Sequence, residues 1–107
     1  MDKKIRLKVY DKFGGRCAYC GQEIEYKDMQ VDHIEPKNLG GSDDIDNLFP
    51  TCRLCNHYKR GDRLETFRNW KLGGLVDRLR NIYIFKVAEK YGMIEVKGWD
   101  KMFYFEK

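Results

Sequence analysis

The stretch from Cys52 to Arg60, Cys-Arg-Leu-Cys-Asn-His-Tyr-Lys-Arg, decides the fold that we expect for this chain. The stretch begins with a Cys-x-x-Cys pair. Amide, imidazole and ammonium groups come next, within about one turn of a predicted helix. Two earlier stretches carry side chains that complement it. One is a second cysteine pair, Cys17-Ala18-Tyr19-Cys20, and the other is Val31-Asp32-His33-Ile34, a carboxylate and an imidazole at the end of a predicted strand.

Length and composition predict one folded domain over residues 1–107. A hydrophobic content of 42% with 14% aromatic residues is enough for a small core. The chain has no apolar run of transmembrane length, and its first residues lack the apolar core of a signal peptide. We therefore expect no membrane partner and a cytoplasmic location in a bacterial or phage-infected cell, where reduced thiols are free to bind metal.

The charges are unevenly distributed, although the net charge is only +4. Residues 1–16 carry six basic and two acidic side chains, residues 17–50 two basic and eight acidic, and residues 51–80 eight basic and three acidic. Basic segments suit a phosphate backbone, and an acidic centre suits a divalent cation. The alternative is a set of solvated faces without a partner.

Apolar spacing and turn residues predict the secondary structure. Ile5, Val9 and Phe13 form the apolar stripe of a first helix, which Gly14-Gly15 ends. Pro50 limits the second of two short strands that flank a polar loop. The predicted elements are helices over residues 3–13, 52–59, 62–72 and 75–91 and short strands over 29–34, 48–49, 93–96 and 102–105.

The four cysteines predict a closed structural zinc site. They form two Cys-x-x-Cys pairs separated by 31 residues, and four thiolates suit a tetrahedral Zn²⁺ ion. Two disulfides or four buried free cysteines are the alternatives, but the spacing and a reducing compartment favour zinc. The proposed zinc ligands are Cys17, Cys20, Cys52 and Cys55.

The order of the motifs resembles the zinc-stapled branch of the HNH endonuclease family. Between the cysteine pairs lie Asp32-His33-Ile34 and the run Gly-Gly-Ser-Asp-Asp-Ile-Asp-Asn-Leu from Gly40 to Leu48, and the second pair continues into Asn56-x-x-Lys59. The resemblance implies an α+β fold with a ββα-metal core over about residues 13–61. It implies that zinc staples this core, which has an N-terminal helix before it and a helical C-terminal extension over about residues 62–107 after it.

The same resemblance implies roles for individual residues. Asp32 and Asn56 would hold one catalytic ion, Mg²⁺ or Mn²⁺, His33 would be the general base, and Asn47 would be the structural middle asparagine of the motif. Some relatives use a histidine as the last ligand, so His57 stays open as an alternative to Asn56. The family pattern and the preference of Mg²⁺ for oxygen ligands favour Asn56.

The chemistry of these residues agrees with phosphodiester hydrolysis. An imidazole titrates near neutral pH, so His33 can take a proton from water. A hard ion held by a carboxylate and an amide keeps positions open for phosphate and water. Lys59, Arg60 and Arg63 follow the proposed ligand and could bind DNA phosphates.

We therefore expect a divalent-metal-dependent DNA endonuclease of a phage or mobile element, without a small-molecule organic cofactor. One alternative is a zinc-stapled DNA-binding module without catalysis, and another is a zinc protein that binds other proteins. Asp32, His33 and Asn56 together favour the enzyme, because a binding module has no need of these three side chains.

Overall fold

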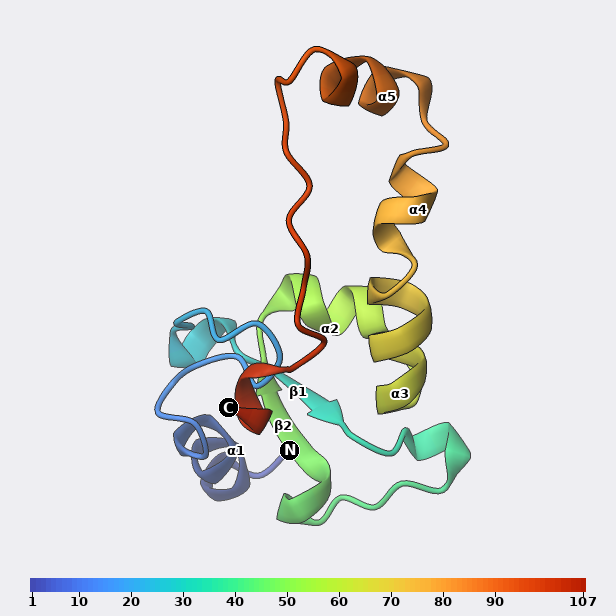
Figure 1. The fold of residues 1–107 in the computed structure, drawn as a ribbon. Helices are drawn as coiled ribbons and strands as arrows, with labels where there is room; N and C mark the ends of the chain where they lie inside the picture. Colours follow the sequence, from blue (N-terminus) through green and yellow to red (C-terminus); the bar gives the residue numbers. More distant parts are fainter. The chain divides into compact units, whose positions relative to one another are not determined.

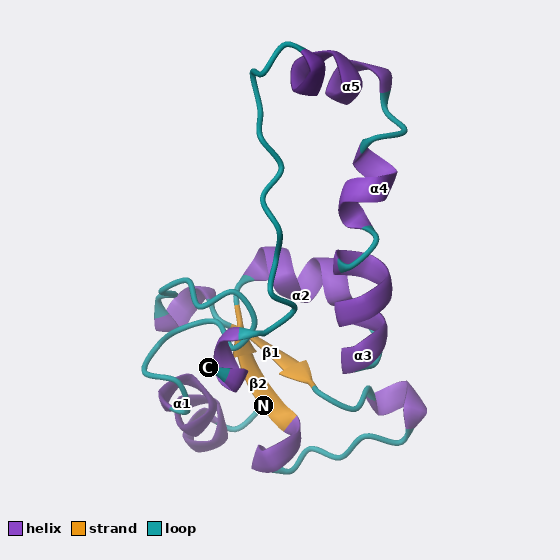
Figure 2. Ribbon diagram, viewed as in Figure 1, coloured by secondary structure: helices purple, strands orange, loops and turns teal.

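The computed structural model describes residues 1–107 and divides them into two compact units. The first unit contains Met1–Leu64 and Met102–Lys107, and the second contains Glu65–Lys101. The protein has one two-stranded sheet together with helices, which confirms the predicted α+β class (Figures 1 and 2). No helix is both long enough and apolar enough to cross a membrane.

The N-terminal helix α1 (Lys3–Asp11) begins at Asp2, whose carboxylate accepts a hydrogen bond from the backbone N–H of Lys4 at 2.7 Å. Such a cap satisfies one of the free N–H groups at the start of a helix. The prediction placed the helix end at residue 13, whereas α1 stops at Asp11. The stop comes early because Gly14 and Gly15 adopt positive φ angles of 62° and 80° and turn the chain away.

Strands β1 (Gln30–His33) and β2 (Leu48–Thr51) pair in antiparallel register, with Asp32 opposite Phe49 and His33 opposite Leu48. All four β2 residues are buried. Pro50 lies within β2, which is therefore longer than the predicted strand. The carbonyl of Pro50 accepts a hydrogen bond from the backbone N–H of Ala18 at 2.8 Å, so β2 is held against the loop that carries the first cysteine pair.

Helix α2 (Arg53–Lys59) follows β2 and completes a β-β-α unit (Figure 2). Its N-cap is Cys52, whose sulfur accepts a hydrogen bond from the backbone N–H of Cys55. It ends at Lys59, and its C-cap is Arg60, which has a positive φ of 54°. The sequence placed this helix correctly because the cysteine pair marks its start and Gly61 follows its end.

The connection from β1 to β2 contains two single turns of 3-10 helix, η2 (Lys37–Leu39) and η3 (Ile45–Asn47). Gly41 lies so close to the backbone of Glu35 that a β-carbon added there would be 1.7 Å from the Glu35 carbonyl oxygen. Only glycine fits at this position, so the loop requires the Gly-Gly step of the sequence.

The C-terminal residues return to the cysteine loop of the first unit. The backbone N–H groups of Tyr104 and Phe105 donate to the carbonyls of Tyr19 and Ala18 at 3.0 and 2.9 Å. The rings of Phe103 and Phe105 pack against Tyr19. The predicted strands over 93–96 and 102–105 are wrong: residues 93–96 form no strand, and residues 102–105 meet an irregular loop and enter the 3-10 turn η5 (Tyr104–Glu106).

The second unit is a series of short helices. α3 (Leu64–Thr66) leads into a π-helix, η4 (Phe67–Leu72), and then come α4 (Leu75–Leu79) and α5 (Tyr83–Lys90). The single helix predicted over 75–91 is interrupted because Ile82 is extended, with φ −90° and ψ 125°. Phe67 is the one buried residue between Glu65 and Lys101, so this unit has almost no core of its own.

Truncating the returning segment at its most buried residue tests its contribution to folding. Phe103→Ala should lower the free energy of unfolding by about 3–5 kcal/mol, the usual cost of removing a buried aromatic ring. Leu7→Ala, at a 51% exposed position on α1, is the control and should change stability little. Urea unfolding followed by circular dichroism measures both, and equal midpoints would show that the tail does not stabilise the unit.

Candidate metal centre and active site

The two cysteine pairs meet at the base of the β-β-α unit, as the sequence predicted. The four sulfur atoms all lie within 4.8 Å of one another, and none is in a disulfide. The Cys20 and Cys52 sulfurs are 3.8 Å apart. A tetrahedral zinc ion with Zn–S bonds of about 2.3 Å separates its sulfurs by about 3.8 Å, so the cluster has the right size to hold such an ion.

The pKa values of the cysteine thiols also fit a cluster that binds a cation. A hydrogen bond from Cys55 lowers the pKa of the Cys17 thiol to about 5, whereas burial raises the pKa of Cys20 to about 11. The hydrogen bond to Cys17 also raises the pKa of Cys55. Four thiolates this close repel one another, so they can all lose their protons only when a cation replaces them.

Asp32 is buried beneath the same loop, with 5% of its surface exposed. The Tyr19 hydroxyl, from between the first two cysteines, donates to Asp32 Oδ2 at 2.5 Å. Burial raises the pKa of the Asp32 carboxyl, against the opposing effects of Tyr19 and Lys59. Burial and the nearby Asp32 carboxylate also raise the pKa of Tyr19, so its hydroxyl stays protonated and remains a donor.

Lys59 provides the second contact to Asp32. Its ammonium lies 3.1 Å from Asp32 Oδ2 and also donates to the carbonyl of His33 at 3.3 Å. We expected Lys59 to contact DNA phosphates, but its side chain is fully buried because the last turn of α2 faces β1. In this structure, Lys59 neutralises a carboxylate instead of presenting its charge at the surface.

One cavity brings together side chains from β1 and α2. It has a volume of about 310 Å³ and is lined by Asp32, His33 and Asn56, among others. The half-buried side chain of Asn56 makes no hydrogen bond within the protein, so its amide is available to a ligand. The neighbouring His57 is exposed and does not line this cavity, because successive residues on a helix point about 100° apart.

Asn47 ties together the two ends of the loop between the strands. Its Oδ1 accepts from the backbone N–H of Glu35 at 2.8 Å, and its Nδ2 donates to the carbonyls of Glu35 and Ser42 at 3.1 and 2.8 Å. These contacts use both halves of the amide on backbone groups. Asn47 therefore shapes the loop and does not line the cavity of Asp32 and Asn56.

The two arginines that follow α2 have different surroundings. Arg60 is exposed and lines the cavity of Asp32 and Asn56, so its guanidinium can reach a phosphate bound there. Arg63 is also exposed and forms an ion pair with Glu35 at 2.9 Å. Exposed pairs of this kind are weak, so a phosphate could compete for Arg63.

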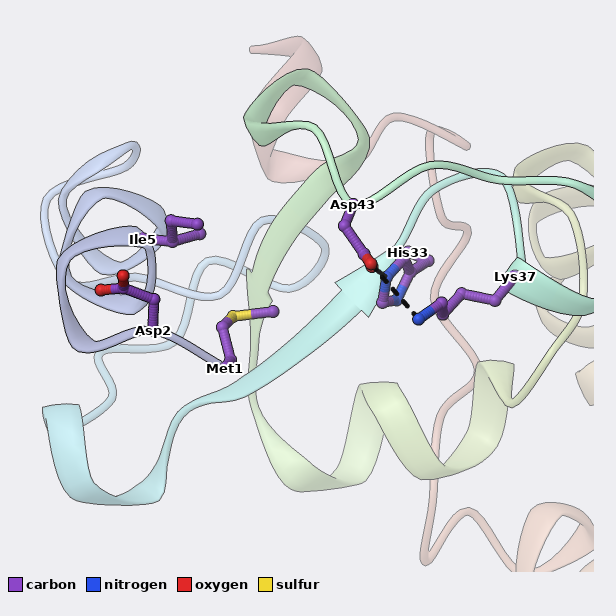
Figure 3. A pocket seen from close by; sticks show the side chains of 6 residues that line it. All are labelled: Met1, Asp2, Ile5, His33, Lys37 and Asp43. Atoms are coloured by element: carbon purple, nitrogen blue, oxygen red, sulfur yellow. Dashed lines mark hydrogen bonds and ion pairs between the residues drawn. The ribbon is translucent and has the colours of Figure 1, made fainter.

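Sequence reasoning did not identify three side chains near the predicted residues: Tyr19 contacts Asp32, Asp43 contacts His33, and Lys37 contacts Asp43. Asp43 Oδ1 is hydrogen-bonded to His33 Nε2 at 2.7 Å, and Asp43 Oδ2 pairs with the Lys37 ammonium at 3.3 Å (Figure 3). Asp43 lies in the predicted polar loop between the strands, which contains three aspartates close together. Nothing in the local pattern separates one of them from the others.

Comparison with known proteins places these elements in a family. The model of the HNH endonuclease family matches residues 17–72, which include all four cysteines and Asp32, His33, Asn47 and Asn56. The CRISPR-associated endonuclease Cas9 of Actinomyces naeslundii is 39% identical over 98 residues, or 91% of this chain and 8% of that protein. YoqL, a prophage-derived protein of Bacillus subtilis named as an HNH endonuclease, is 32% identical over 58% of this chain and 30% of its own length.

A solved structure agrees with the sequence matches. The crystal structure of the Type II-C Cas9 enzyme from Actinomyces naeslundii superposes on 72% of this chain and 10% of that protein, with a TM-score of 0.56 and 27% identity. The chain spans no more than 30% of the length of the curated relatives that it matches. The matched region contains the cysteine cluster, the β-β-α unit and the cavity, and on this basis the chain belongs to the HNH endonuclease family.

Proposed function

We propose that this chain is a divalent-metal-dependent DNA endonuclease, with His33 as general base and one catalytic ion held by Asp32 and Asn56. The main support is that these three side chains line one cavity although they come from two separate elements, β1 and α2. Membership of the HNH endonuclease family supports the reaction class. The relatives named Cas9 and YoqL are called endonucleases.

The donor set favours a hard cation. A carboxylate oxygen from Asp32 and an amide oxygen from Asn56 suit Mg²⁺ or Mn²⁺ better than an imidazole from His57 does. When bound, such an ion supplies charge relief to the phosphate and to the leaving oxygen. Tyr19 and Lys59 fix the orientation of Asp32, so the carboxylate itself is already in place, and only the Lys59 ammonium must move to make room for an ion.

In this proposal His33, Arg60 and Arg63 act on the water and the DNA phosphates. His33 accepts the proton of the attacking water, and Arg60 pairs with a phosphate in the cavity. Arg63 adds affinity at the surface by exchanging Glu35 for a phosphate. Zn²⁺ at the four cysteines is structural, because all four ligand positions are filled and none is left for water.

A zinc-stapled DNA-binding module without catalysis is the second candidate. The observation that favours it is the Lys59 ammonium on Asp32, which already neutralises the carboxylate that the enzyme would use for its ion. The two candidates differ in one requirement, since only the enzyme needs a divalent ion in the cavity.

Zinc content tests the structural site. We expect one zinc per chain, and Cys52→Ser should lose both the zinc and cooperative folding because metal binding is part of the folding free energy. His57→Ser, which removes an exposed potential ligand two residues after Cys55, should keep the zinc. Elemental analysis with circular dichroism measures both, and a wild-type protein without zinc would contradict the proposal.

Cleavage of supercoiled plasmid tests the reaction and its base. We expect nicked or linear DNA with Mg²⁺ and none with EDTA. His33→Ala should lose at least ~10²-fold in rate, the usual scale of general-base catalysis, while still binding DNA. His57 is the only other histidine, so His57→Ala is the matched control, and its cleavage rate should fall far less.

The outcomes separate the candidates. Salt-sensitive DNA binding without cleavage at any concentration of divalent ion would favour the binding module. Near-normal cleavage by His33→Ala would remove this histidine from the mechanism.

A further inference from the structure

His33 lines two cavities. On one side is the cavity shared with Asp32 and Asn56. On the other side is a second cavity of about 330 Å³, lined by His33, Lys37 and Asp43 together with residues at the start of α1 (Figure 3). Asp43 lines only the second cavity, and the two side chains that it contacts, His33 and Lys37, line both cavities.

The contact between His33 and Asp43 fixes which ring nitrogen carries a proton. His33 Nε2 is 2.7 Å from Asp43 Oδ1. Hydrogen bonds from His33 and Lys37 hold the pKa of the Asp43 carboxyl below its usual range, so the group is ionised and can only accept. In the neutral imidazole, the proton must then be on Nε2, and Nδ1 keeps the lone pair that accepts a proton.

Asp43 is held from both sides. Lys37 donates to its second oxygen, Oδ2, at 3.3 Å. The preceding residue, Ser42, is tied by its carbonyl to Nδ2 of Asn47. The middle asparagine of the HNH motif therefore holds the loop that carries Asp43 opposite His33.

We propose that Asp43 is a positioning residue that keeps His33 protonated on Nε2 and so makes Nδ1 the nitrogen that takes the proton from water. The proposal rests on the proposed function, in which His33 is the general base. Lys37 contributes by directing Asp43, because its ammonium holds the oxygen that does not face the ring.

The substitution Asp43→Asn makes a sharp test because the Lys37 ammonium would keep the amide oxygen. The amide nitrogen would then face His33 Nε2 and donate to it, which moves the imidazole proton to Nδ1. A buried aspartate-to-asparagine change in the serine-protease triad acts in this way, by imposing the wrong tautomer. The lone pair at Nδ1 would be lost, although the ring stays in place.

Nitrogen-15 NMR of the imidazole rings reads the tautomer without substrate or catalytic ion. At a pH where the rings are neutral, wild-type His33 should show a protonated Nε2 and an unprotonated Nδ1, and Asp43→Asn should exchange these signatures. His57, the only other histidine, is an internal reference and should not change. In plasmid cleavage, Asp43→Asn should lower kcat at least about tenfold with KM unchanged.

Asp44→Asn is the matched control, because this neighbouring exposed carboxylate makes no side-chain contact with His33. It should leave both the NMR signals and kcat at wild-type values. Both variants should keep their zinc and their thermal midpoint, because Asp43 is 64% exposed and its ion pair contributes little to stability.

The results separate this proposal from the function on which it rests. Unchanged His33 nitrogen signals in Asp43→Asn, or an exchange of signals with undiminished kcat, would overturn the positioning role of Asp43. The role of His33 as general base would still stand if His33→Ala is inactive. Normal cleavage by His33→Ala would instead contradict the proposed function.

Discussion

The carboxylate of Asp32 joins three elements of the first unit at one buried point. It receives a hydroxyl from Tyr19 in the cysteine loop and an ammonium from Lys59 in α2, while Asp32 itself belongs to β1. A buried charge without partners costs several kcal/mol, so the arrangement is stable only while all three elements keep their places. The cysteine cluster holds two of these elements together. Cys17 and Cys20 flank Tyr19 in the cysteine loop, and Cys55 lies in the first turn of α2. A metal at the cysteines would therefore act on the candidate active site through Tyr19, without touching the substrate.

Aromatic packing around Tyr19 explains how a small domain can keep the Asp32 carboxylate buried. Tyr19 is packed against Phe49, Phe103 and Phe105, so the hydroxyl lies at the end of a ring that cannot move freely. The C-terminal residues supply two of these rings from outside the region that the family model matches. This return of the chain gives residues 102–107 a structural role near the site.

Much of this fold and site could be predicted from the sequence because the signals are local and strongly constrained. Two Cys-x-x-Cys pairs fix a cluster, Asp32-His33 marks the end of β1, and Asn56 follows the cysteine pair at the start of α2. The remainder depends on contacts between distant positions. Whether Lys59 faces solvent or β1 is decided by the rotation of α2, and which of three nearby aspartates meets His33 is decided by how Asn47 shapes the loop. The predicted strand over 102–105 is absent because a strand needs a partner strand, and Tyr104 and Phe105 bond to an irregular loop instead.

The most direct measurement of the central claim is a crystal structure with Mn²⁺ and a DNA substrate that resists cleavage. Anomalous scattering recorded between the manganese and zinc absorption edges separates a catalytic ion from one at the cysteines. The account predicts one manganese peak in the cavity, within about 2.0–2.5 Å of an Asp32 oxygen and of the Asn56 amide oxygen. It also predicts that the Lys59 ammonium shifts away from the oxygen that binds the ion. A peak on His57 instead of Asn56, or no peak beside Asp32, would contradict the account.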